Sequence, residues 1–284
     1  MPEQISNCNV FDNAIVVFID ILGYRDLVER VAAKPELVKG MENLFYGVVV
    51  DAMRKLAELE LEGITGKPDP EIQEYYSKVV SSIRVRCISD SFIFTLPVSA
   101  VNFRCRSYDE KTTVGNCIET LFSAMVMLST LFISKMGYIL RGGISYGNHY
   151  ESERDRQFFI FSEAFNRAVQ LEKDIAKTPR IVMDEHVLQY LGKIGYPNID
   201  KYFYKDEEDD YYCLDIYKSL RVFGNAQQQD VLYHIKQGIT LAIQNNTGKP
   251  DVLAKLPHFA QYHNRWVTGA AVNQPHLAID LNKT

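Results

Sequence analysis

Residues 15–24, which read IVVFIDILGY, constrain the fold of this chain more than any other segment. An apolar run of strand length stops at a single carboxylate, Asp20, and Gly23 follows it closely. A buried strand that ends in Asp and turns at Gly places a charged oxygen ligand beside exposed backbone N–H groups. That arrangement suits a hard metal ion carrying phosphates. The alternative is that Asp20 only caps the helix that follows.

A second carboxylate stands in a comparable position farther along the chain. Residues 83–96, IRVRCISDSFIFTL, contain two short β-rich runs on either side of Asp90, which predicts a hairpin with Asp90 at its tip. Some phosphoryl-transfer folds use one strand-end Asp and one hairpin Asp to bind a pair of metal ions. The spacing alone leaves open whether Asp20 and Asp90 meet.

The rest of the chain alternates helix and strand patterns and then becomes helical. The expected elements are helices over 24–54, a long apolar helix over 113–135, a strand over 139–145, a polar connection over 150–156, a strand and helix over 158–173, a strand over 181–183, a helix over 184–191, a hairpin from 201–204 and 211–217, and helices over 227–245 and 251–266. We therefore expect one domain over residues 1–218 and a helical C-terminal extension over 219–284, which packs on the core or extends a dimer interface.

Size and charge set limits on the partners. The chain has 284 residues, of which 46% are hydrophobic and 24% charged, enough to bury a sizeable core. A net charge of −5 argues against a general polyanion-binding surface, so long nucleic acid is not an expected partner, while a local site for a small triphosphate stays compatible.

The sequence also indicates a cytoplasmic protein. No apolar run approaches the roughly 20 residues of a membrane span, and the N-terminus lacks the basic-then-apolar order of a signal peptide. The cysteines are scattered without a C-x-x-C pair, so we expect buried free thiols rather than a zinc site or disulfides: Cys8, Cys87, Cys105, Cys117 and Cys213.

Four stretches occur in an order that resembles the class III nucleotidyl cyclases, the superfamily of adenylate and guanylate cyclases. They are FIDILGY (18–24), ISDSF (88–92), LRGGISYG (140–147) and FSEAFNRAVQLE (161–172). The resemblance covers about residues 12–217. It implies an α/β fold with a ferredoxin-like βαββαβ core and a central, mostly antiparallel sheet.

The resemblance implies a two-metal site. Asp20 and Asp90 match the family's metal-binding aspartates, and the backbone from Ile21 to Gly23 matches the turn that contacts the metals and the triphosphate. Two Mg²⁺ or Mn²⁺ ions are then expected per site. Cyclisation needs the ribose 3′-OH to attack the α-phosphorus while pyrophosphate leaves, and the ions serve both groups.

Further matches concern the substrate. Arg141 corresponds to an arginine that grips the phosphates, although a strand arginine beside two glycines is equally compatible with a structural ion pair. Asn166 corresponds to the asparagine that orients the ribose, and Lys205, or less closely Lys201, to a phosphate-binding lysine. In this family each site takes its metals from one subunit and its asparagine from the other, which implies a homodimer.

The base-reading positions depart from the purine cyclases. Arg86 and Phe159 stand where that family reads a purine with a lysine or glutamate and with an aspartate or cysteine. Phe159 cannot hydrogen-bond a purine edge and would fill space, which suggests a smaller base. Arg86 offers only donors, which favours UTP over CTP and does not exclude guanine. Tyr46 is a candidate for narrowing the base pocket, although core packing is its alternative role. The pattern is most similar to the bacterial pyrimidine cyclases of anti-phage signalling, whose cyclic UMP or cyclic CMP activates a separate effector.

A second departure concerns activity itself. Gln170 stands where the family usually has a transition-state arginine, and Arg167, on a neighbouring face of the same helix, is a possible substitute. Two alternatives therefore accompany an active pyrimidine cyclase. One is an inactive, nucleotide-sensing dimer of the same fold, and the other is a purine cyclase.

Overall fold

The computed structural model describes residues 11–36, 38–39, 42–43, 70–154, 157–218, 220, 225–269 and 272–281. Within these residues one sheet has the strand order β2-β3-β1-β4-β6-β8-β7, with β5 paired to β4 outside this path. The strands are β1 (Asp12–Ile21), β2 (Arg84–Ile88), β3 (Ser91–Pro97), β4 (Leu140–Arg154), β5 (Gln157–Ser162), β6 (Ile181–Met183), β7 (Phe203–Lys205) and β8 (Tyr212–Leu214).

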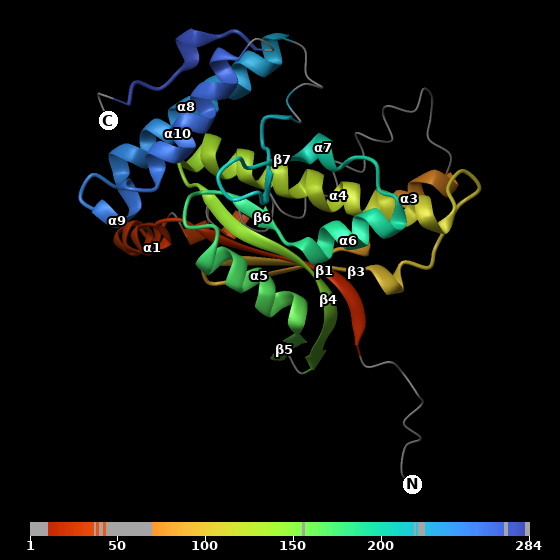
Figure 1. Ribbon diagram of the computed structural model, residues 1–284. Coiled ribbons are helices and arrows are strands. Elements are labelled where there is room, and N and C mark those ends of the chain that lie inside the picture. Colours follow the sequence, from red (N-terminus) through yellow and green to blue (C-terminus); the bar gives the residue numbers. More distant parts are fainter. Residues whose placement is uncertain are drawn as a thin grey trace.

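Helices cover both faces of the sheet (Figure 1). They are α1 (Tyr24–Ala33), α3 (Pro70–Ser81), α4 (Glu110–Leu131), α5 (Glu163–Asp174), α6 (Glu185–Ile194), α7 (Ile199–Tyr202), α8 (Asn225–Asn245), α9 (Pro250–Leu253) and α10 (Leu256–Thr268). Short 3₁₀ turns lie at Val98–Ala100 and Pro275–Leu277. These elements confirm the predicted mixture of an α/β core and a helical extension.

The first four strands form the predicted βαββαβ core. Along the chain the elements run β1, α1, α3, β2, β3, α4, β4, with both α1 and α3 between β1 and β2, and in the sheet the strands lie in the order β2-β3-β1-β4. All three of these pairings are antiparallel, whereas β4 and β6 pair in parallel. The ferredoxin-like topology and the mostly antiparallel sheet expected from the sequence are therefore confirmed.

Strand β1 separates two packed layers because successive side chains point to opposite faces. Ile15, Val17 and Ile19 belong to the main core, which includes α3 and α4. Ala14 and Val16 pack with Ala164 of α5 on the other face. The period of two places the side chain of Asp20 on the α5 face.

Helix α4 is the central core helix. With the π-helical segment Phe132–Met136 it forms a continuous helix, Glu110–Met136, that is long and apolar enough to cross a membrane by length and composition. The expectation that no apolar run approaches this length is therefore wrong. Yet 61% of its apolar window is buried inside the protein. Helix α4 contacts β3, α3 and α7, and its π-helical continuation contacts α8. Because it is packed on several sides, it has apolar residues on all of its faces.

Strand β4 is longer than the sequence indicated. The expected polar connection over 150–156 is wrong at its start, because β4 continues to Arg154 and pairs with β5. Its charged residues meet arginines of β2. Arg84 contacts Glu151 at 2.9 Å and Arg86 contacts Glu153 at 3.0 Å. Ion pairs between strands allow a strand that carries several charged residues to remain in the sheet.

The C-terminal helices pack on the core, which is one of the two arrangements expected from the sequence; the other was an extended dimer interface. Helices α8 and α10 share an apolar cluster with Leu22, Ile133 and Ile139 of the core. Helix α8 approaches at Gly238, where an added Cβ would lie 1.7 Å from the carbonyl oxygen of Ile133. Only a residue without a side chain permits this contact.

The described cysteines are free thiols. Cys117 and Cys213 are buried as expected, whereas Cys87 is exposed because β2 is the edge strand of the sheet. Cys8 lies outside the described residues.

Candidate active site

The structure brings Asp20 and Asp90 together. Asp20 is the penultimate residue of β1, and Asp90 lies in the turn between β2 and β3. In the β1–β3 register Asp20 lies opposite Ser91, and the Ile21 N–H donates to the Asp90 carbonyl oxygen at 3.1 Å. The hairpin predicted from the sequence thus carries Asp90 to the end of the strand that carries Asp20.

Arg141 lies across from Asp20 on the neighbouring strand. The β1–β4 register pairs the two residues, and Arg141 Nε donates to Asp20 Oδ2 at 3.0 Å. Arg141 Nη2 also lies 2.6 Å from Glu172 Oε1, on α5. In this structure the structural ion pair, one of the two roles considered for Arg141, is formed.

Glu172 belongs to this cluster but was not among the site residues predicted from the sequence. The signal was present, because Glu172 closes the matched stretch FSEAFNRAVQLE, and it lies one helical turn beyond Ala168 on the side of α5 that faces the sheet. A glutamate at a buried helix position needs a cationic partner, which Arg141 supplies.

The carboxylates of this cluster lie in a partly desolvated environment. Burial is the largest influence on Asp20 and raises its pKa to about 6, the Arg141 guanidinium acts in the opposite direction, and the charges of Glu172 and Asp90 raise it further. Burial also raises the pKa of Glu172. Asp20 and Glu172 thus share one guanidinium, with the charge of Asp90 nearby, and a divalent cation would relieve the repulsion among these carboxylates.

The donor set fits Mg²⁺ or Mn²⁺. Aspartate and backbone carbonyl oxygens are the hard ligands that these ions prefer, and Mg²⁺ keeps several waters and substrate phosphates as its remaining ligands. Within the described residues there is no group of three or more His, Cys, Asp or Glu side chains arranged to hold a metal. Asp20, Asp90 and the Ile21 carbonyl would therefore be completed by triphosphate and water.

The turn after β1 presents a helix N-terminus to this cluster. Gly23 adopts φ 83°, in the left-handed region, and α1 begins at Tyr24. Among the described residues no side chain caps α1, so the alternative role of Asp20 as a helix cap is not formed. Open N–H groups at a helix N-terminus favour phosphate.

Asn166 and Gln170 lie on the exposed side of α5. Gln170 lines a groove of about 520 Å³ between α5, α6 and the β7–β8 turn. Asn166 precedes Glu172 by about 9 Å along the helix axis and lies on a different face. Asn166 therefore does not lie beside the carboxylate cluster of its own chain.

Arg167 is held by structural contacts. Its Nη2 donates to the Tyr146 carbonyl oxygen at 2.6 Å and its Nε to Ser145 Oγ at 3.1 Å, with Asp184 nearby at 3.6 Å. These contacts anchor α5 to β4 and α6. Arg167 as a transition-state cation stays a prediction from the resemblance.

The two candidate lysines differ in accessibility. Lys205 ends β7 with its side chain 54% exposed and pairs with Asp210 at 2.6 Å. Lys201 pairs with Glu119 of α4 and also contacts the ring of Tyr202. Lys205 is thus the freer of the two to reach a ligand.

Arg86 and Phe159 lie on opposite faces of β5. The Arg86 guanidinium stacks on Phe158, 4.7 Å from the ring centroid, whereas the Phe159 side chain points outward and is 56% exposed. One chain therefore does not place both at one pocket. Tyr46 lies outside the described residues.

The predicted residues thus fall into two groups. We define the carboxylate half-site as Asp20, Ile21, Gly23, Asp90, Arg141 and Glu172. We use the term substrate half-site for the predicted substrate residues outside this cluster, which lie on separate elements and do not meet at one pocket: Asn166, Gln170, Lys205, Arg86 and Phe159. Among the described residues no hydrogen bond or ion pair joins the two half-sites.

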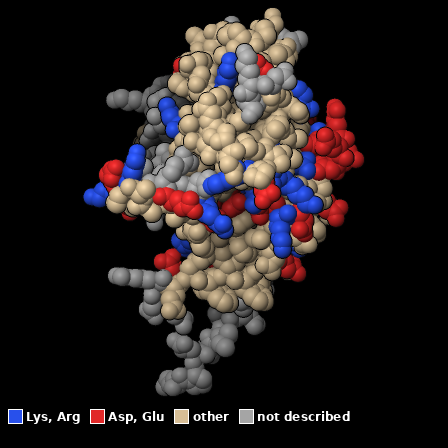
Figure 2. Space-filling view, turned by 90° about the vertical axis from the view of Figure 1, so that its left-hand side faces the viewer, with Lys and Arg blue, Asp and Glu red and all other residues tan. Residues whose placement is uncertain are grey.

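The end of the molecule that carries the carboxylate half-site is rich in charge. Figure 2 views the side on which α1 and α9 lie in Figure 1, and basic and acidic side chains gather in a band across its middle. Intermixed charge of both signs is the ordinary pattern of a globular protein surface, so this band by itself does not mark a ligand site.

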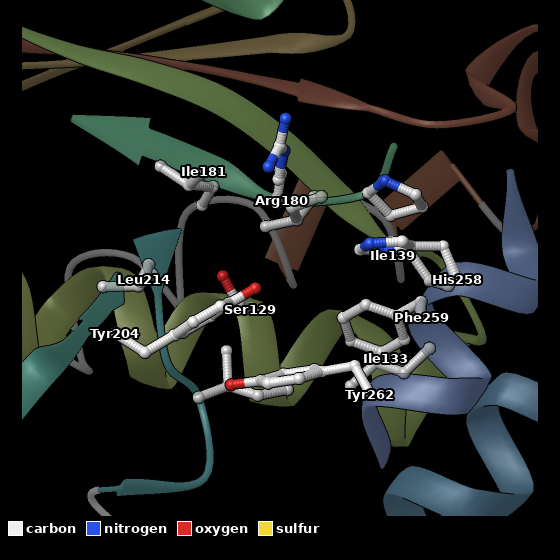
Figure 3. Close-up of a pocket in the computed structure, with 13 residues that line it drawn as sticks. Ser129, Ile133, Ile139, Arg180, Ile181, Tyr204, Leu214, His258, Phe259 and Tyr262 are labelled. Atoms are coloured by element: carbon white, nitrogen blue, oxygen red, sulfur yellow. The ribbon is translucent and has the colours of Figure 1, made fainter. Parts of the chain in front are cut away.

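A separate small cavity lies where α10 meets the core (Figure 3). His258, Phe259 and Tyr262 of α10 reach toward Tyr204 and Ile181 there, and the enclosed space is about 30 Å³, enough for about two waters. It contains neither Asp20 nor Asp90, so it belongs to the seam of the extension and not to the carboxylate half-site.

Comparison with solved structures finds cyclase domains. The dimeric guanylyl cyclase domain of the RhoGC fusion protein from the aquatic fungus Blastocladiella emersonii matches with TM-score 0.38 and 13% identity, over 71% of this chain and 93% of that chain. The adenylyl cyclase CyaB from P. aeruginosa matches with TM-score 0.37 and 12% identity, over 72% and 95%. The guanylyl cyclase Cya2 matches with TM-score 0.37 and 10% identity, over 72% and 92%.

No protein-family model matches the sequence, and no curated protein matches it. Structural likenesses with TM-scores of 0.37 to 0.38 carry no argument about activity. The activity must therefore be argued from the residues and their geometry.

Proposed function

We propose that this chain is a metal-dependent nucleotide cyclase that converts a nucleoside triphosphate to the 3′,5′-cyclic monophosphate and pyrophosphate. The observation that carries the proposal is the meeting of Asp20 and Asp90 beside the open N-terminus of α1. Two hard carboxylates beside a helix N-terminus are suited to a metal-bound triphosphate.

The chain's own residues have distinct proposed roles. Bound Mg²⁺ or Mn²⁺ would acidify the 3′-hydroxyl and neutralise phosphate charge. Asp20 and Asp90 hold the ions, and the turn at Gly23 orients the triphosphate. Arg141 positions Asp20 through its 3.0 Å hydrogen bond and can turn toward phosphate when metal replaces it.

The two half-sites support a homodimer. A complete site needs Asn166 to orient the ribose and Lys205 to hold phosphate, and these residues do not contact the carboxylate half-site of their own chain. An exposed aromatic patch on and beside β5 supports a contact between copies, since Phe159 and Phe161 are 56% and 62% exposed and Phe11 packs on Phe161. Monomeric proteins rarely expose such patches without function.

A pyrimidine is the proposed base, with UTP favoured over CTP. Arg86 carries only donors, so it suits the O4 acceptor of uracil and opposes the amino group of cytosine. The resemblance to pyrimidine cyclases suggests a product that acts as a second messenger in anti-phage defence through a separate effector. A purine cyclase is the alternative, since guanine also presents an acceptor.

The decisive experiment is incubation of the purified chain with each of the four NTPs and Mn²⁺ or Mg²⁺, followed by product analysis. We expect cyclic UMP in the largest amount, and no cyclic product from any NTP would refute the proposal. Asp20→Ala and Asn166→Ala should each abolish turnover. A mixture of these two variants should regain up to about a quarter of the activity, because mixed dimers keep one intact site.

A second candidate function is nucleotide sensing without turnover. Gln170 in place of an arginine favours it, as does the anchoring of Arg167 on Ser145 and Tyr146. Calorimetric titration with UTP, with and without Mg²⁺, together with analysis of the products, distinguishes the two, because a sensor binds the nucleotide but leaves it unchanged.

A further inference from the structure

Helix α5 packs so closely on β4 that Glu172 reaches Arg141 (Figure 1). An added Cβ on Gly143 would lie 2.2 Å from the Ala168 carbonyl oxygen, so only a residue without a side chain permits this approach. Arg141 lies two residues before Gly143, on the same face of the strand, and Glu172 follows Ala168 by one helical turn. The glycine thus brings a buried glutamate within reach of the arginine.

Arg141 acts as an internal cation of the carboxylate half-site. Its Nε donates to Asp20 Oδ2 at 3.0 Å, and its Nη2 lies 3.0 Å from the same oxygen. Nη2 is also 2.6 Å from Glu172 Oε1. The guanidinium therefore covers one of the two oxygens with which Asp20 can bind a metal ion, and its charge repels a divalent cation there.

These three side chains are largely buried. Their exposed fractions are 21% for Arg141, 15% for Asp20 and 10% for Glu172. A charge at such a depth is costly without a partner, so Arg141 can release Asp20 only if other anions hold it. Glu172 is such a partner within the protein, and the triphosphate of the proposed substrate is a second one.

We propose that Glu172 is a positioning residue that shares Arg141 with Asp20 and keeps hold of it when Arg141 releases Asp20 to a metal ion. The inference rests on metal binding by Asp20 and Asp90 in the proposed function, and it adds a coupling between metal and substrate. Arg141 competes with a lone metal ion for Asp20. A triphosphate draws Arg141 away, so metal and triphosphate favour each other's binding.

The test measures the affinity of the full chain for Mn²⁺ at pH 8 without nucleotide, by electron paramagnetic resonance of the free ion. Arg141→Gln removes the internal cation, so the dissociation constant for Mn²⁺ should become about 10- to 100-fold smaller, as is usual for coupled sites. Arg141→Lys keeps the charge and should stay within about 3-fold of the wild type. The control is Arg106→Gln, which removes a 90% exposed arginine paired with Glu71 and should leave the affinity unchanged.

A double-mutant cycle isolates the role of Glu172. Glu172→Gln should weaken Mn²⁺ binding about 10-fold in the wild type, because Arg141 then pairs with Asp20 alone. In the Arg141→Gln background the same change should weaken binding by about 3-fold or less, since only the loss of a negative charge remains. Equal effects in the two backgrounds would show that Glu172 acts through its own charge, and would overturn the positioning role.

A measurement on the unaltered chain avoids any folding defect of the variants. The Nε–H group of Arg141 gives an NMR signal that is assigned by its absence from the spectrum of Arg141→Lys. Mg²⁺ with inorganic tripolyphosphate should shift this signal as Arg141 leaves Asp20 Oδ2, whereas Mg²⁺ alone at the same concentration should shift it much less. A signal that magnesium tripolyphosphate leaves unchanged would overturn the release of Arg141.

The outcomes separate this inference from the cyclase proposal. If no NTP is cyclised but Arg141→Gln tightens Mn²⁺ binding and the cycle shows coupling to Glu172, the cyclase proposal fails and the role of Glu172 stands. If an NTP is cyclised but Arg141→Gln binds Mn²⁺ as the wild type does, the cyclase proposal stands and the coupling through Arg141 fails.

Discussion

Replacing Asp20 by asparagine is expected to stabilise the metal-free protein at pH 8. The pKa of Asp20 is raised from 3.8 to about 6, chiefly by burial, so the fold prefers the protonated form. Stability from this group is present below the unfolded pKa of 3.8 and is lost as pH rises through about 6. The ionised Asp20 therefore costs about 3 kcal/mol at pH 8, at 1.36 kcal/mol for each unit.

The measurement is urea unfolding in the presence of a chelator at pH 8 and pH 4. Asp20→Asn mimics the protonated side chain, so its free energy of unfolding should exceed that of the wild type by about 3 kcal/mol at pH 8. The gain should shrink to about 0.5 kcal/mol at pH 4, where the folded wild type is already protonated. Asp230→Asn, at a side chain that is 71% exposed, serves as the control and should change stability by less than about 0.5 kcal/mol.

Addition of Mn²⁺ should reverse the order. A divalent ion binds the ionised carboxylate, so the wild type should gain thermal stability with Mn²⁺ at pH 8 and gain much less at pH 5. Asp20→Asn should gain little at either pH. A variant less stable than the wild type at pH 8 without metal, or a stability gain independent of pH, would refute the electrostatic reasoning.

Four further predictions concern the turn at Gly23, the recognition of the nucleotide base, the carboxylate of Glu172 and the docking of the C-terminal extension. Gly23→Ala forces φ 83° on a residue with a side chain, so the free energy of unfolding should fall by about 1–2 kcal/mol and the affinity for NTP should decrease. Arg86→Gln adds an acceptor, and the ratio of UTP to CTP turnover should drop by about 10-fold. Glu172→Gln should raise the Mn²⁺ concentration needed for half-maximal activity, because Arg141 would then bind Asp20 more tightly. His263 is buried between Tyr217 and the Leu277 carbonyl with its pKa lowered to about 4 by burial, so docking of the extension should be stable above pH 6.5 and weaken toward pH 4, monitored by Trp266 fluorescence.

Local chemistry explains why much of the core was predictable. The Gly23 turn, the Asp90 hairpin and the Ser162 cap on α5 are each fixed by residues within a few positions of one another. Ser162 Oγ accepts from the Phe165 N–H at 3.0 Å, as its place before the helix predicts. Such short-range signals do not depend on the rest of the fold.

Long-range partners were harder to see in the sequence. Residues 150–154 have the polarity of a loop, yet Arg84 and Arg86 from a distant strand pair with Glu151 and Glu153 and keep them in β4. The long apolar helix expected over 113–135 is confirmed, and contacts on several sides bury a pattern that by length and composition also fits a membrane span. In each case the partner lies far away along the chain.

The site residues proposed from the sequence divide into those that lie together in one chain and those that do not. Asp20 and Arg141 are cross-strand neighbours, so the register of β1 and β4 determines their contact in one chain. Asn166 begins the same helix that ends near Glu172, and about 9 Å of rigid helix separates them. A change of side-chain rotamer cannot carry Asn166 across this distance and also onto the face of α5 that bears Glu172. The proposed reaction, which uses both groups at one site, would therefore take them from two copies of the chain.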